Sequence, residues 1–254
     1  MAIVGEKLKS YVADQIKIRQ EKLSPNYIKT DQDLIYFDAK TAWVKMASAV
    51  YVEEDKLKKL GYSDANIRVL KGKGLAQKHI LFGGIADIDP VYYGVPLKTK
   101  QGFGAPSKEY TNKKGEIRNY LNPSSYDISK DFGIVPNPGI KDVSIKCLNR
   151  GSLKKAKLKI RVENKFQLQV IDVLYLRLGY TMLLEWGNSH YYDNEGKLKN
   201  TPITLIEKYF FGGNKNQSLQ KLSNNIEKFR DKYKGNYDGF IGKVSNFNWN
   251  FNND

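Results

Sequence analysis

The sequence predicts an α+β fold that is rich in β-strands. Residues 141–147 and 155–164 alternate apolar and polar side chains, as strands with one covered face do. Helical spacing of apolar residues follows at 165–178, and alternation returns at 180–187. Between residues 141 and 187 we therefore expect the order strand, strand, helix, strand.

The N-terminal part is expected to begin with an amphipathic helix over residues 1–24. Its apolar residues recur at helical spacing, and Ser24 and Pro25 would end it. These apolar residues are Leu8, Val12, Ile16 and Leu23. Residues 25–131 are predicted to form a mixed region of strands and loops, with a partly alternating strand within 39–52.

Residues 90–140 are expected to form an irregular, extended connector. This range holds six of the eight prolines of the chain, together with many Gly, Asn and Ser residues. We place a soft domain boundary near Phe132, so that a second domain covers residues 132–254.

The first two strands of this domain are predicted to form a hairpin around "LNRGSLK", residues 148–154, where Asn and Gly favour a turn. One face of the hairpin is apolar, with Val143, Ile145, Cys147, Ala156, Leu158, Ile160 and Val162. The other face is basic along Lys157, Lys159 and Arg161. We expect Cys147 to be a small core residue and the basic face to be wet.

The most apolar stretch of the chain is "VLYLRLGYTMLLEWGNS", residues 173–189. It is too short to span a membrane and carries Arg177 and Glu185. We interpret it as the end of the helix over 165–178, a stop at Gly179, and a strand. The inward face of this core strand is predicted to carry Tyr180, Met182, Leu184 and Trp186.

The C-terminal part combines a helix with one more strand. Leu219, Leu222, Ile226 and Phe229 have helical spacing within a segment of about 190–238. Phe247, Trp249 and Phe251 alternate with asparagines and predict a strand. Because that strand resembles half a hairpin, we expect the natural chain to continue beyond Asp254.

Charge and cysteine content limit the kind of protein. The chain has 254 residues, 42 Lys and Arg against 27 Asp and Glu, and a net charge of +15. Such an excess fits nucleic acid, an anionic membrane surface or an acidic neighbouring subunit, as well as a simple lysine-rich surface. A single cysteine excludes an internal disulfide framework. The N-terminus lacks the apolar core of a secretory signal.

Residues capable of catalysis are sparse. His79 and His190 are the only histidines and are interpreted as structural. The pairs Asp87 with Asp89 and Asp31 with Asp33 could hold a divalent cation, but no loop signature surrounds them. We expect no enzyme activity, no cofactor and no metal. The basic residues of 154–161 could contact phosphates, although no aromatic residues lie between them for stacking on bases.

Several stretches resemble the tail-tube-like domain of baseplate hub and tube-initiator proteins, which are structural proteins of tailed phages and other large double-stranded DNA viruses. The resemblance lies in a Pro-Gly before the first strand, an Arg-Gly in the hairpin, "LYLRLGYTMLLEWG" after the helix and the late "FNWNFNND". Upstream, "KTAWVKMASAV" and "VLKGKGLAQKHILFGG" resemble the N-terminal part of these proteins. The segment 190–238 fits least and is interpreted as a helical insertion.

This resemblance implies a tail-tube-like β-sheet domain with a packed helix. It also implies a virion structural protein, made in the host cytoplasm, that self-associates into a ring as a hexamer or as a trimer with internal duplication. Other virion proteins and passing genomic DNA are the implied partners. In the resembling proteins the hairpin tip reaches the neighbouring subunit, so Arg150, Lys154 and Lys155 are expected there. A basic nucleic-acid-binding protein is the alternative, and an enzyme with acidic residues converging in a cleft ranks third.

Overall fold

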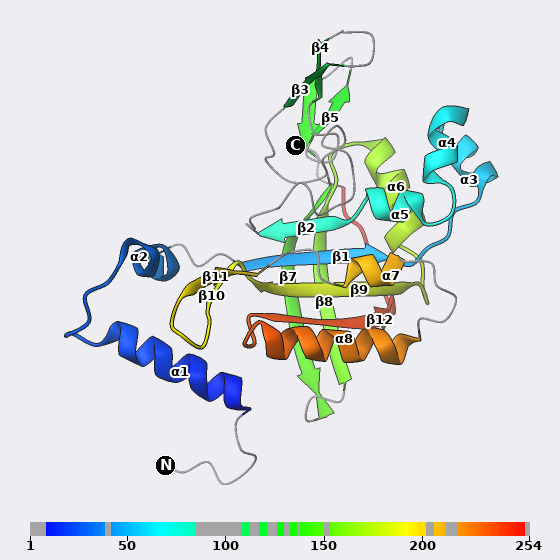
Figure 1. Cartoon of the computed structure of the whole chain (residues 1–254). Helices are drawn as coiled ribbons and strands as arrows, with labels where there is room; N and C mark the ends of the chain where they lie inside the picture. Colours follow the sequence, from blue (N-terminus) through cyan, green and yellow to red (C-terminus); the bar gives the residue numbers. More distant parts are fainter. Residues whose placement is uncertain are drawn as a thin grey trace.

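The computed structural model describes residues 9–38, 42–84, 108–111, 117–120, 126–129, 133–136, 138–149, 153–201, 206–211 and 218–251. These residues form antiparallel sheets and eight helices, which confirms the α+β class (Figure 1). Arg150 and Gly151 at the hairpin tip, and Asp87 and Asp89, lie outside the described residues.

A four-stranded antiparallel sheet forms the centre of the molecule. Its order is β12-β9-β1-β2, with bounds Tyr237–Lys243, Thr181–Asn188, Ala42–Ser48 and Leu81–Gly84. The sheet joins strands from both sides of Phe132, and one cluster of buried side chains includes residues from both sides. The predicted boundary near Phe132 therefore does not separate two independent cores.

Strand β9 is the predicted core strand, and it is covered on both faces. Met182 and Leu184 are buried, and Tyr180 and Trp186 pack against the core, all on the predicted face. Leu183 and Glu185, on the opposite face, are fully buried as well. The sequence therefore predicted one of two covered faces.

The predicted hairpin is present as β7, Gly139–Leu148, and β8, Leu153–Arg161. It crosses the strands of the central sheet in Figure 1 and contacts them at both edges. At β2, a Cβ on Gly83 would lie only 2.5 Å from the carbonyl oxygen of Ile140. The predicted inner face packs on the core as far as Ile145, but Cys147 is exposed, because the hairpin tip extends beyond the sheet.

Helix α6, Lys165–Tyr175, follows β8 as predicted. Its first turn is capped by Asn164, whose side chain accepts a hydrogen bond of 2.8 Å from the backbone N–H of Gln167. The helix ends three residues earlier than predicted. Phe166 and Leu178 are exposed and Gln167 is buried, so the apolar face is Val170, Ile171 and Leu174.

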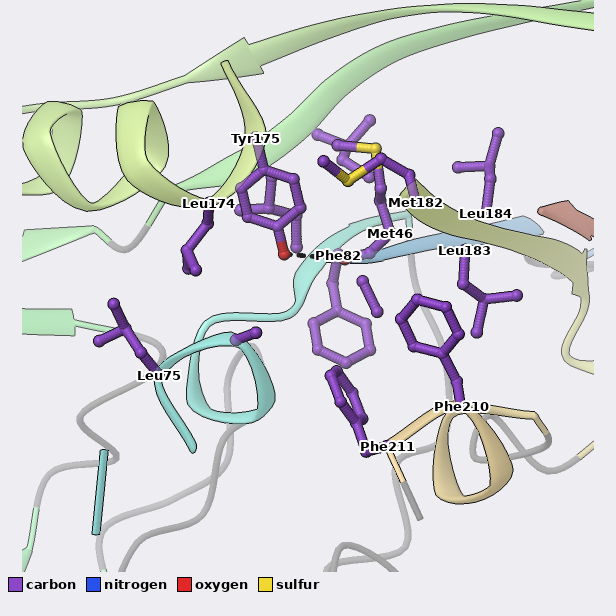
Figure 2. Close-up of a cluster of buried hydrophobic side chains, with 14 of the residues drawn as sticks. Met46, Leu75, Phe82, Leu174, Tyr175, Met182, Leu183, Leu184, Phe210 and Phe211 are labelled. Atoms are coloured by element: carbon purple, nitrogen blue, oxygen red, sulfur yellow. Dashed lines mark hydrogen bonds between the residues drawn. The ribbon is translucent and has the colours of Figure 1, made fainter. Parts of the chain in front are cut away.

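Figure 2 shows how the two faces of the sheet are covered. Met46 and Met182 lie on the side of α6, where the hydroxyl of Tyr175 donates to the carbonyl of Met46 at 3.2 Å. Phe82 and Leu183 point to the other side, toward Phe210 and Phe211.

The other side of the sheet is covered by α5, Gly74–Lys78, α7, Glu207–Phe211, and α8, Leu219–Lys232. Leu222 and Ile226 of α8 are buried, as predicted, whereas Leu219 is exposed. A short hairpin, β10 His190–Tyr192 with β11 Leu198–Asn200, precedes α7 and α8 in the chain. The segment 190–238 thus supplies part of the main core.

The N-terminal helix α1, Ser10–Leu23, is followed by α2, Asp31–Asp38. The predicted apolar face is wrong, because Ile16 and Leu23 are exposed. The helix instead buries Gln15, whose side chain donates to the carbonyl of Tyr192 at 2.6 Å.

Two further corrections concern the connector and the C-terminus. Four short strands lie in the predicted connector, as the hairpins β3–β4 and β5–β6. Their bounds are Lys108–Thr111, Ile117–Tyr120, Tyr126–Ser129 and Gly133–Pro136. Strand β12 ends at Lys243, and residues 244–251 form no strand. The remaining helices are α3, Glu54–Lys59, and α4, Asp64–Leu70.

Candidate functional site

The outer face of the β7–β8 hairpin carries five exposed basic side chains, which we call the cationic face. They are Lys146, Lys155, Lys157, Lys159 and Arg161. The β-strand alternation that turns Ala156, Leu158 and Ile160 toward the core turns the residues between them outward. The sequence predicted this face correctly on β8.

The charges of the cationic face have few partners. Lys146 lies directly opposite Lys155 in the register, and such like-charge pairs are unfavourable. Among the described residues, no carboxylate oxygen lies within 4.0 Å of the ammonium groups of Lys146, Lys155, Lys157 or Lys159. Arg161 contacts the carboxylate of Glu163 at 2.5 Å. The face is thus a concentration of positive charge that the described part of the chain hardly neutralises.

The described end of the hairpin also exposes two leucines. Leu148 and Leu153 lie opposite each other, and their exposed fractions are 41% and 52%. Side chains two positions apart on a strand point to the same side, so both leucines lie on the outer face of the hairpin, next to the lysines. The leucine pair and the cations beside it together offer another molecule both an apolar and a charged contact.

Lys154 occupies a different position from its neighbours. Its ammonium lies 3.1 Å from the carboxylate of Asp238 on β12 and 5.5 Å from the ring centre of Trp186 on β9. Asp238 is shared with Arg230 of α8, at 2.6 Å. Lys154 therefore ties the hairpin to the sheet, whereas Lys155 on the outer face stays exposed. Of the three expected intersubunit residues, Lys155 is the one that the structure leaves available among those it describes.

A cavity of about 480 Å³ lies between the hairpin and one end of the central sheet. Its lining includes Trp43, Trp186, Asn188, Asn236 and Asp142. The indole N–H of Trp43 is buried and has no hydrogen-bond partner among the described residues. The cavity shows where the hairpin separates from the sheet, next to the Asp238 contact.

A buried ion pair lies on the opposite face of the sheet. Lys45 and Glu185 are directly opposite in β1 and β9, with 1% and 0% of their side chains exposed and 2.9 Å between charged atoms. The other carboxylate oxygen of Glu185 accepts from the hydroxyl of Tyr237 at 2.8 Å and from the backbone N–H of Ile206 at 3.1 Å. Sequence analysis missed this pair. The available signal was one Lys and one Glu, each alone in an apolar strand.

Asp33 is the second buried carboxylate, and it lies where α2 meets α1 and β10. It accepts from the hydroxyls of Thr30 and Tyr192 at 2.7 and 2.8 Å, from Tyr27 at 3.0 Å, and from Lys22, also at 3.0 Å. Burial opposes ionisation, but the hydrogen bonds from Thr30, Tyr192 and Lys22 outweigh it, so the pKa of Asp33 is well below its usual range. A carboxylate surrounded by donors serves as a structural anchor and not as a cation ligand.

The two histidines make local contacts. The Nδ1 atom of His79 lies 2.9 Å from the carbonyl oxygen of Leu75, and that of His190 lies 2.9 Å from the side-chain oxygen of Asn200. Within the described ranges, no group of three or more His, Cys, Asp or Glu side chains is placed to hold a metal ion.

Comparison with known proteins identifies no relative: no family model, no curated protein and no solved structure matches this chain. None of the helices described here is long and apolar enough to cross a membrane. The candidate site therefore rests on its geometry, which presents the apolar tip and the cationic face of the hairpin as the surface available to a partner.

Proposed function

We propose that the protein is a virion structural component that forms part of a ring or tube in a tail, baseplate or vertex-spike apparatus for genome delivery. The observation that carries this proposal is the exposed leucine pair, Leu148 and Leu153, at the described end of a basic hairpin. The class of protein is proposed from the resemblance of the hairpin, helix and strand sequences to tube-initiator proteins.

The central sheet supports the proposal because it is an open sheet with an edge strand on each side, and the hairpin lies against parts of both edges. Strand β2 is the edge on one side and β12 on the other. Exposed edges invite pairing with another chain, and closed rotational symmetry satisfies such surfaces without unlimited growth. In a ring, the leucine pair and Lys155 of one subunit would meet its neighbour, and Arg150 is expected to join them.

Assembly of the purified protein tests the proposal, by sedimentation velocity and electron microscopy over a range of protein concentrations. We expect the parent to form rings, and the double variant Leu148→Ser with Leu153→Ser to remain monomeric with an unchanged circular dichroism spectrum. Leu219→Ser, which removes an equally exposed leucine from α8, is the control and should still assemble.

Two results would contradict the proposal. A parent protein that stays monomeric at every concentration would remove the assembly function. Rings formed by the Leu148 and Leu153 double variant would show that the hairpin tip is not the contact.

A further inference from the structure

The cationic face is a regular array. Lys155, Lys157, Lys159 and Arg161 alternate along β8, so that neighbouring side chains on this face are about 6.6 Å apart and the row is about 20 Å long. Lys146 stands on the adjacent strand, directly opposite Lys155. The positions are held by a paired backbone, so the spacing of the charges is built into the hairpin.

The described part of the chain compensates this array only in part: Arg161 is paired with Glu163, and Asp142 lies opposite Lys159 in the register. Placing Lys146 opposite Lys155 is unfavourable unless an external negative charge is present. The inner face of the hairpin is packed on the core, which fixes the outward direction of the lysines. The arrangement therefore suits a partner that brings several negative charges at once.

A second copy of this chain is a poor partner for the array. Each copy has a net charge of +15. The exposed acidic run Glu53, Glu54 and Asp55 at the start of α3 is followed within the same helix by Lys56, Lys58 and Lys59, and Glu54 is paired with Lys58 at 3.0 Å. Such mixed surfaces are a poor match for a row of four cations with a fifth beside it.

We infer that the cationic face binds the sugar-phosphate backbone of duplex nucleic acid. Each strand of a DNA duplex carries one phosphate per about 3.4 Å of helix axis, so a row of cations about 20 Å long faces several phosphates at once. The exposed hydroxyl-bearing residue Ser144, opposite Lys157, adds a donor suited to phosphate oxygens.

The same face argues against single strands as the ligand. Its outward residues on β7 and β8 include no aromatic side chain, and stacking on aromatic rings is what single-strand binders use. Contacts of such cations to phosphate oxygens position a protein on the duplex but carry no sequence information. We therefore expect binding without sequence preference. This inference rests on the hairpin of the unassembled chain; in a ring, where Lys155 is expected at the subunit contact, Lys157, Lys159 and Arg161 remain for the duplex.

Fluorescence anisotropy with a short labelled DNA duplex tests the inference, with a duplex RNA of the same length as a second probe. If all five cations contact phosphates, the logarithm of the association constant should fall against the logarithm of salt concentration with a slope of roughly −4.5. Reversing two of them, Lys157→Glu with Lys159→Glu, should reduce the slope to roughly −2.7 and weaken binding at least about tenfold at low salt.

The matched control is Lys221→Glu with Lys228→Glu, which makes the same change in net charge on α8, on the other side of the sheet. It should bind DNA within about threefold of the parent, since its lysines are outside the array. The milder pair Lys157→Gln with Lys159→Gln serves if charge reversal disturbs the fold, and it should reduce the slope by a similar amount.

Three results would overturn the inference. One is a parent that does not bind duplex at low salt. Another is equal loss of binding in the hairpin and control variants, which would assign the effect to net charge. The third is retention by vesicles containing anionic lipid with no retention of duplex, which would make the hairpin a membrane-surface element.

Discussion

At the scale of single residues, the two buried carboxylates hold different parts of the molecule together. Glu185 on β9 pairs with Lys45 of β1 and accepts hydrogen bonds from Tyr237 of β12 and from the backbone N–H of Ile206, just before α7. Asp33 joins two helices to the β10–β11 hairpin. Transferring a charge from water into the protein interior is costly. The fold tolerates each carboxylate because a lysine and several hydrogen-bond donors surround it.

We predict that Glu185→Gln destabilises the protein by about 3 to 5 kcal/mol, because Lys45 would keep a buried charge without its counter-charge. Urea unfolding at neutral pH measures the change. The double variant Lys45→Met with Glu185→Leu is the informative comparison. It should recover a large part of the loss, since apolar residues of similar volume can replace a buried pair. A double variant less stable than Glu185→Gln would contradict this account.

Asp33 should make stability depend on pH in the acidic range. Its pKa is depressed in the folded state, so the stabilisation is complete above the unfolded value of about 3.9 and is lost as the pH falls toward the folded value. We expect Asp33→Asn to cost about 1 to 3 kcal/mol at neutral pH, because hydrogen bonds to a buried charge are lost. As the pH is lowered from 5, the unfolding free energy of the variant should also fall less than that of the parent.

Unfolding free energies measured across that pH range check the prediction for Asp33. Asp14→Asn, an exposed carboxylate on the same pair of helices, is the control and should follow the parent. Parallel pH profiles for parent and Asp33→Asn would show that the acidic loss arises elsewhere.

At the scale of elements, alternation of apolar and polar residues predicted which side chains of a strand share a face. It did not predict which other elements pack on each face. Tyr180, Met182, Leu184 and Trp186 do share a face, because period two is a property of the strand itself. That Leu183 and Glu185 are equally buried depends on α7 and α8, which no local pattern reveals. Likewise Trp249 and Phe251 alternate as in a strand, yet they are exposed and have no partner strand among the described residues.

Glycine in β9 marks a close approach between strands. A Cβ on Gly187 would lie 2.4 Å from the carbonyl oxygen of Asn236 and 3.1 Å from the ring of Trp43. We predict that Gly187→Ala costs more than about 2 kcal/mol, because backbone atoms must move. Thermal unfolding compared with Gly242→Ala tests this. At Gly242 the nearest atom is in the Phe240 ring, which can rotate, so the loss there should be smaller. Equal losses would exclude the backbone clash as the cause.

At the scale of the whole molecule, the order of elements between residues 141 and 187 was predictable, and the sheet that they join was not. Local periodicity specifies β7, β8, α6 and β9, but the pairing of β1 with β9 links residues more than 130 positions apart. The site was half predictable for the same reason. The outward lysines of β8 follow from alternation, whereas the use of Lys154 within the chain depends on Asp238, which a distant strand supplies.

The position of β1 inside the sheet also affects how the chain can be made. Its outer neighbour β2 is synthesised soon after it, but β9 begins at Thr181, 181 − 48 = 133 residues after β1 ends at Ser48. At about 5 to 20 residues per second, translation leaves one edge of β1 waiting roughly 7 to 27 s. During that interval Lys45 has no Glu185, and an apolar strand is open to wrong partners. When β9 arrives, any register that separates Glu185 from Lys45 would bury an unpaired charge, so the ion pair favours the native register.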